Sequence, residues 1–132
     1  MIESAEEFVA LRSSECPDQY LRSAHEPASM AVWRDVIARF PAYQFWVAQN
    51  KTVPVEILEQ LSHTGSADVR CMVAMKRKTP ETVLRRLAVD ADESVRQRVV
   101  FNPKVSLEVL EILLEDPWDE IRRSAAEKIL LG

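Results

Sequence analysis

Glycine and cysteine are scarce in this chain of 132 residues, and each shortage excludes a class of function. Glycine occurs only at Gly65 and Gly132, so the glycine-rich loops that cradle phosphate groups are excluded. Cys16 and Cys71 are the only cysteines, which are too few for a disulfide framework. A small core without disulfides is typical of a protein in a reducing compartment.

Histidine is equally scarce, and no constellation of residues for catalysis is evident. His25 and His63 lack partners at metal-ligand spacing, because Cys16 and Cys71 lie across predicted turns from them. Zinc needs four ligands, or three and a water molecule. Cys71 as a nucleophile would need a nearby base and a lowered pKa. We therefore expect no metal, no cofactor and no enzymatic activity.

Long apolar runs are missing too. No segment approaches the roughly 18 to 20 apolar residues that span a bilayer, and the N-terminal MIESAEEF lacks the basic and apolar regions of a secretory signal. We expect a soluble, cytoplasmic protein that does not contact membranes. The net charge of −4 argues against a dedicated nucleic-acid binder, whose domain is normally basic.

A regular internal repeat is what the sequence does contain. The pairs Val69-Arg70, Val95-Arg96 and Ile121-Arg122 follow one another at intervals of 26 residues. Other apolar positions keep the same interval: Val47, Val73, Val99 and Ala125; Leu58, Leu84 and Leu110; Leu61, Leu87 and Leu113. Such self-similarity is the signature of a repeat architecture.

Each repeat is predicted to form two short helices. In the second repeat, VRCMVAMK has apolar residues at helical spacing, and RKTP then interrupts it. Thr79 is predicted to cap the second helix, with Pro80 at its first position. Asp92 is predicted to cap the helix that opens at Glu93. Near the N-terminus, Ser4-Ala5-Glu6-Glu7 has the spacing of a capping box.

Helices this short cannot bury their apolar stripes alone, so neighbouring repeats are expected to stack. We predict an all-α fold: a right-handed α-solenoid of about four and a half helix pairs with a 26-residue period. It is expected to form a single domain over residues 1–132, with a degenerate N-terminal capping repeat (1–42), three full repeats (43–68, 69–94 and 95–120) and a C-terminal half repeat (121–132).

The repeat resembles the leucine-rich repeat variant family of helical repeat proteins, which are related to HEAT and armadillo arrays. The segment VRCMVAMKRKTPETVLRRLAVDADESVRQRVVFNPKVSLEVLEILLEDPWDEIR carries the likeness, which covers residues 43–126. The family pattern runs approximately VA-x-NP-x-TP-x-x-x-L-x-x-LA-x-D, and Lys76 stands where it has asparagine. The resemblance implies a helical superhelix with a binding role, and it transfers no catalytic residue.

Two charge features have both a structural and a functional interpretation. Arg70, Arg96 and Arg122 either tie repeat to repeat through nearby acids or form a row for a ligand, and we favour the ties. Residues 69–104 hold 9 basic and 4 acidic side chains, so the middle of the chain is basic. This segment is either an ordinary solvated surface or a surface for an acidic partner.

The candidate binding residues are at repeat positions that share no residue type, because packing alone does not dictate such positions. Large apolar and basic side chains there are the types enriched in interface cores. We predict a non-enzymatic protein-protein interaction module that uses the face made by the first helices of its repeats. Its predicted partner-binding residues are Trp46, Met75, Lys76, Arg77, Arg98 and Phe101.

Several alternatives stay open. Trp46 either contacts a partner or completes the core, and Trp118 is either a lid on the final helix or an exposed anchor. We expect a monomer that binds a protein, which the basic residues suit to an acidic partner, and no nucleic acid. The other two possibilities are a HEAT-like DNA glycosylase type of nucleic-acid binder and a structural protein that self-associates through Ile129, Leu130 and Leu131.

Overall fold

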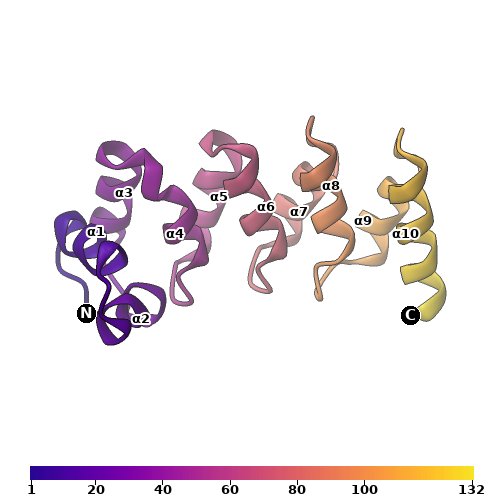
Figure 1. Ribbon diagram of the computed structural model, residues 1–132. Helices are drawn as coiled ribbons and strands as arrows, with labels where there is room; N and C mark the ends of the chain where they lie inside the picture. Colours follow the sequence, from indigo (N-terminus) through magenta and orange to yellow (C-terminus); the bar gives the residue numbers. More distant parts are fainter. The chain divides into compact units, whose positions relative to one another are not determined.

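The computed structural model describes all residues from 1 to 132, and its fold is all-α as expected (Figure 1). It contains ten α-helices and one short 3-10 helix, and the only β-type contact is an isolated bridge between Ile2 and Ala28. None of the helices has the length and apolar character needed to cross a membrane. The chain divides into two compact units, residues 1–65 and 66–132, which are described separately.

The first unit contains five α-helices. They are α1 (Ala5–Ser13), α2 (Pro17–His25), α3 (Met30–Arg39), α4 (Gln44–Gln49) and α5 (Val55–Thr64), with the 3-10 helix η1 (Pro41–Tyr43) before α4. Helix α1 packs on both α2 and α3, while α2 packs on α4 and α3 on α5. Phe8 and Trp33 are fully buried where α1 meets α3, and their rings meet edge to face at 5.3 Å.

Helix α1 begins where the capping box predicts. Ser4 Oγ accepts a hydrogen bond from the backbone N–H of Glu7 at 3.0 Å. The Glu7 carboxylate reaches back to the N–H of Glu3 at 2.7 Å, one residue before the capping residue itself. Both bonds satisfy backbone donors that have no partner within the helix.

The second unit also contains five helices. They are α6 (Ala67–Met75), α7 (Glu81–Leu87), α8 (Glu93–Val100), α9 (Leu107–Leu113) and α10 (Asp119–Leu131). The first helices of the predicted repeats form one row in this unit, in which α6 packs on α8 and α8 on α10 (Figure 1). The second helices, α7 and α9, pack on each other, and fully buried valines such as Val73, Val83 and Val99 fill the core.

One predicted cap is confirmed and another is wrong. Asp92 Oδ1 accepts a hydrogen bond from the N–H of Ser94 at 2.8 Å and caps α8 as predicted. Thr79 does not cap α7, because its buried hydroxyl donates to the carbonyl of Val73 at 2.6 Å and so closes the end of α6. Helix α7 therefore begins one residue later than predicted, with Pro80 as its capping residue.

Long polar side chains join successive first helices at positions 26 residues apart. Asn102 is fully buried, and its amide donates to the carbonyls of Ala74 and Lys76 at 2.7 and 2.9 Å. Lys128 Nζ donates in the same way to the carbonyls of Val100 and Asn102 at 3.0 and 3.2 Å. These bonds satisfy carbonyls at helix C-termini, which explains why both asparagine and lysine suit this position.

Candidate functional site

The six residues predicted to bind a partner do not all belong to one unit. Trp46 lies on α4 in the first unit. The others lie in the second unit: Met75, Lys76, Arg77, Arg98 and Phe101. Arg98 and Phe101 line a common groove, and the remaining three lie at the turn between α6 and α7.

Trp46 is half-buried and takes part in packing within the first unit. The guanidinium carbon of Arg12 lies 3.4 Å from the centre of the Trp46 ring and 4.1 Å from the centre of the Tyr20 ring. Phe45 meets Trp46 edge to face at 4.8 Å. A guanidinium between two aromatic rings is a favourable cation–π arrangement, so Trp46 has a structural role whether or not it also contacts a partner.

The end of α6 and the turn after it present an apolar side chain and two basic ones, Arg77 and Lys78, to solvent. Met75 is the last residue of α6 and is 46% exposed, and Arg77 is exposed in the turn. Lys76 lies between them and is half-buried. Its backbone N–H donates to the carbonyl of Val73 at 3.2 Å and so closes the helix.

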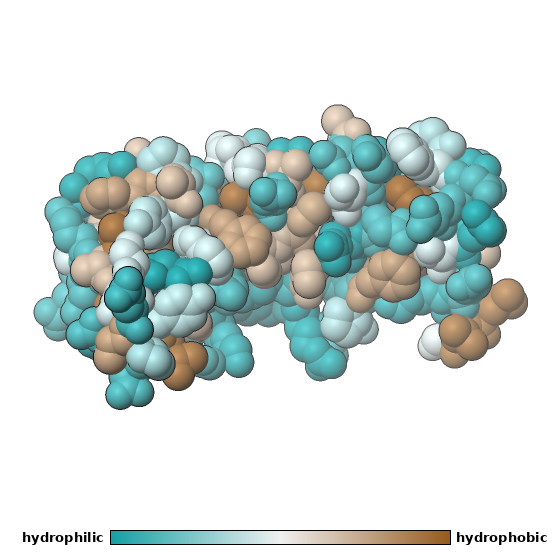
Figure 2. Space-filling view, viewed as in Figure 1, coloured by the Kyte–Doolittle hydropathy of each residue, from teal (hydrophilic) through white to brown (hydrophobic).

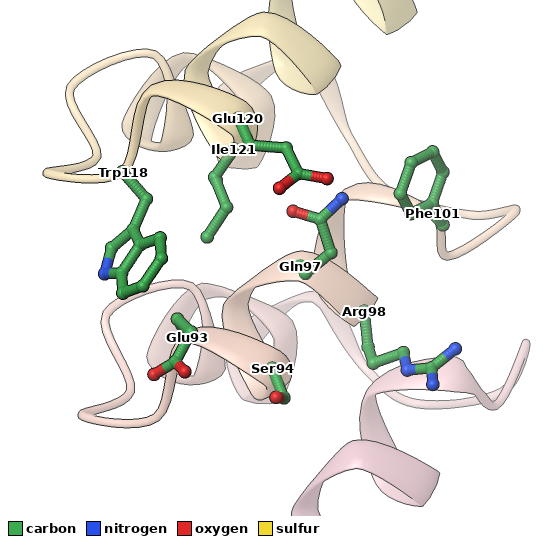
Figure 3. Close-up of a pocket in the computed structure, with 8 residues that line it drawn as sticks. All are labelled: Glu93, Ser94, Gln97, Arg98, Phe101, Trp118, Glu120 and Ile121. Atoms are coloured by element: carbon green, nitrogen blue, oxygen red, sulfur yellow. The ribbon is translucent and has the colours of Figure 1, made fainter.

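A groove of about 380 Å³ lies between α8 and the start of α10 (Figure 3). Gln97, Arg98 and Phe101 line it from the end of α8, and Trp118 and Ile121 line it from the other side. Phe101 is 57% exposed and Trp118 is 50% exposed, so two aromatic side chains flank a concave surface. On the face seen in Figure 2, apolar side chains occur in small separate areas among hydrophilic ones.

Trp118 was not among the predicted binding residues, although the repeat contains a signal for it. It stands 26 residues after Asp92, which caps α8, and Trp118 makes no capping hydrogen bond to α10. Loss of a capping side chain costs about 1 kcal/mol of stability. A half-exposed tryptophan in place of a capping residue is therefore not explained by the stability of α10.

The charged residues of the groove have no partners within the chain. No intramolecular ion pair involves Glu93, Glu120 or Arg98. Figure 3 shows Glu93 beside Trp118 at one end, Arg98 and Phe101 at the other, and Glu120 extending toward Gln97. The groove therefore carries the acidic group of Glu93 at the Trp118 end, that of Glu120 near Gln97 and the basic group of Arg98 at the Phe101 end. Glu93, Gln97 and Glu120 were also missing from the predicted site.

The repeated arginines have a structural role, as favoured from the sequence: Arg70 and Arg96 pair with carboxylates of their own repeat, and Arg96 and Arg122 bond to backbone carbonyls of the preceding repeat. Arg96 is buried, and its Nε donates to Asp116 Oδ2 at 2.7 Å while Nη1 donates to the carbonyl of Asp90 at 2.7 Å. Arg70 forms the equivalent fork with Asp90 at 2.8 and 3.1 Å. Arg122 donates to the carbonyl of Asp116 at 2.7 Å, the equivalent of the contact from Arg96 to Asp90. These carboxylate partners lie 20 residues beyond their arginines, farther along the chain than the adjacent acids suggested.

Cys71 does not have the environment of an activated nucleophile. Burial raises the pKa of its thiol above the ordinary value, although nearby Arg98 opposes this shift. A reactive cysteine needs the opposite shift, because the thiolate is the nucleophile. Metal-binding residues do not gather elsewhere either, since no three His, Cys, Asp or Glu side chains are grouped to hold an ion.

Comparisons with protein-family models, with curated proteins and with solved structures gave no match to this chain. The groove between α8 and α10 must therefore be interpreted from its own residues.

Proposed function

We propose that the chain is a non-enzymatic protein-binding module of the cytoplasm, built as a right-handed α-solenoid of about four and a half helix pairs with a 26-residue period. The row formed by α6, α8 and α10 supports this proposal, because repeated helices create an extended surface. The contacts of Arg70 and Arg96, and those of Asn102 and Lys128, recur at intervals of 26 residues and support the same period.

The groove between α8 and α10 is the observation that carries the functional proposal. Phe101 and Trp118 remain about half exposed beside a concave surface, and Arg98 lies next to Phe101 without an ion-pair partner. Tryptophan and arginine are among the residue types enriched in interface hot spots, and aromatic residues in general are enriched in interface cores. The first helices of the second unit would therefore contact the partner.

The proposed partner segment carries acidic residues toward the Phe101 end. Arg98 lies at that end of the groove, and Lys76 and Arg77 follow the preceding first helix. Opposite charges across an interface accelerate association and exclude incorrect partners. Binding is therefore expected to weaken as the salt concentration rises.

Affinity capture from a native lysate, followed by mass spectrometry, tests this function. The tagged wild-type chain is compared with a Met75→Glu, Phe101→Glu double variant and with a Leu107→Glu control. Leu107 lies on the second helix α9 and is 57% exposed, the same fraction as Phe101. We expect one stoichiometric protein to be recovered by the wild type and the control, and to be lost with the double variant. Recovery by all three chains contradicts the proposed face.

The same experiment separates the two alternative functions. A nuclease-treated lysate is run in parallel, and recovery that depends on nucleic acid overturns the protein-binding proposal. Self-association is suggested by the end of α10, where Leu130 is 85% and Leu131 is 89% exposed. Light scattering over a range of concentrations distinguishes it, because a constant monomer mass rejects self-association.

A further inference from the structure

The two ends of the groove between α8 and α10 differ in the side chain that they suit. At one end Glu93 lies below the Trp118 ring, while Glu120 lies farther along the groove, where its carboxylate extends toward Gln97 (Figure 3). At the other end Arg98 lies beside Phe101. An acidic ligand residue suits the Arg98 end, whereas a carboxylate next to an indole ring suits a cation.

The Trp118 side chain makes no capping hydrogen bond, and the two carboxylates form no ion pair within the protein. Trp118 is half exposed and leaves α10 without a side-chain cap, and neither Glu93 nor Glu120 belongs to an ion pair. Tryptophan is the aromatic side chain that attracts cations most strongly. The planar guanidinium group can stack on such a ring while its N–H groups donate to a carboxylate in the same plane.

We propose that the Trp118 end of the groove binds an arginine side chain from a segment of the partner protein. The inference rests on the proposed protein-binding function and adds the chemistry of the bound segment. The arginine lies against the indole of Trp118, and its guanidinium pairs with Glu93, while Glu120 adds negative charge farther along the groove. An acidic residue of the same segment then lies toward Arg98, so the opposite charges at the two ends fix the direction of the segment.

The indole N–H signal of Trp118 in nitrogen-15 NMR spectra reports directly on this site. Nine-residue peptides of alanine and serine serve as probes, with arginine, lysine, citrulline or glutamate at the centre. Citrulline keeps the shape of arginine but has no charge. We expect the arginine peptide to shift the Trp118 indole signal in a saturable way. The lysine and citrulline peptides should bind at least about fivefold more weakly, and the glutamate peptide should not bind. The Trp33 and Trp46 signals remain in place as internal controls.

Two double variants separate a specific site from general charge attraction. Glu93→Gln, Glu120→Gln removes both groove carboxylates, whereas Glu111→Gln, Glu115→Gln makes the same charge change at exposed residues of α9 and the turn after it. We expect at least about fivefold weaker binding of the arginine peptide to the first variant only. Equal effects of both variants, no effect of either, or no shift with the arginine peptide overturns the proposal.

Two further outcomes are decisive. Argininamide that binds as tightly as the arginine peptide indicates a site for small cations, and it overturns the assignment to a partner segment. A different result would contradict the proposed protein-binding function: the Phe101→Glu variant would capture the same protein as the wild type. If the capture depends on Phe101 but not on Glu93 and Glu120, the protein-binding function stands and the arginine site is wrong.

Discussion

The two units use aromatic side chains in opposite ways. Seven of the nine aromatic residues lie in the first unit, where Trp33 and Phe8 form part of the core and Trp46 stacks under Arg12. The second unit has only Phe101 and Trp118, both about half exposed and both at one groove. Its core is aliphatic. Aromatic rings therefore stabilise the first unit, whereas in the second they are available for a partner.

Polar contacts differ between the units as well. The second unit repeats a fork in which a buried arginine joins a carboxylate 20 residues later, as Arg96 does with Asp116. Gln44 occupies the same repeat position in the first unit and makes only the backward contact, a hydrogen bond to the carbonyl of Ile37 at 3.2 Å. The arginine–carboxylate fork therefore recurs in the second unit and is absent at the equivalent position of the first.

The largest effect is expected from truncation of the core aromatic ring. Trp33→Ala removes a fully buried side chain, and we expect the free energy of unfolding to fall by about 3 to 5 kcal/mol. Phe101→Ala, in the exposed groove, is expected to cost less than about 1 kcal/mol. Urea denaturation measures both changes. Comparable losses would remove the distinction between aromatic residues for packing and for binding.

Loss of a buried tie is expected to have the next largest effect. In Arg96→Ala the carboxylate of Asp116, which is 2% exposed, keeps its charge without its partner. We expect about 3 kcal/mol of lost stability. The control Arg123→Ala removes an exposed arginine, whose side chain is 72% exposed, and is expected to change stability by less than about 0.5 kcal/mol. Equal melting temperatures of the two variants would contradict a structural role for the arginine row.

Asparagine contacts between successive helices occur in both units and should therefore respond alike. Asn102→Ala removes two hydrogen bonds to the carbonyls of Ala74 and Lys76, and we expect a loss of about 2 kcal/mol. Asn50 donates to the carbonyls of Ser23 and Glu26 at 2.8 and 3.0 Å, so Asn50→Ala should cost a similar amount. Thermal denaturation compares them. If only one of the two variants loses much stability, the asparagine contacts of the two units are not equivalent.

The smallest effect concerns an exposed ion pair of the first unit. A hydrogen bond from Arg22, together with the N-terminal ammonium group, lowers the pKa of Glu26 from 4.5 to about 2. Because the folded-state pKa is lowered, the pair stabilises the fold above about pH 4.5, and this contribution is lost as the pH falls toward 2. Glu26→Gln should remove this part of the acid sensitivity. The midpoints of urea denaturation are measured between pH 6 and pH 2.5 for both proteins. If the midpoint of Glu26→Gln falls with pH as steeply as that of the wild type, the prediction is wrong.

The 26-residue repeat and the residue preferences of helix caps predicted much of the helical pattern. The 26-residue interval placed helices at the apolar positions that the core buries, and Asp92 was correctly identified as a cap. Thr79 was misplaced because its hydroxyl has two possible partners, and only the path of the chain decides that it bonds to Val73. The carboxylate partners of the arginines were likewise missed, because folding brings residues 20 positions apart into contact.

The groove was only partly predictable. Arg98 and Phe101 were predicted because they occupy variable positions of the repeat. The repeat period does not show which of these variable positions line a groove. The acids near the repeated arginines were expected to pair with them, whereas two of these acids, Glu93 and Glu120, line the groove. Trp118 was left open between a lid and an anchor, since the sequence does not determine how much of a side chain its neighbours cover.

The most direct test of the account is the dissociation constant between this chain and the purified protein that it captures, measured by isothermal titration calorimetry. The wild type is compared with Phe101→Glu and with the equally exposed control Leu107→Glu. The account predicts at least about tenfold weaker binding for Phe101→Glu, or roughly 1.4 kcal/mol, and an unchanged constant for Leu107→Glu. Wild-type affinity of the Phe101→Glu variant would contradict it, because the exposed aromatic residues would then have no part in binding.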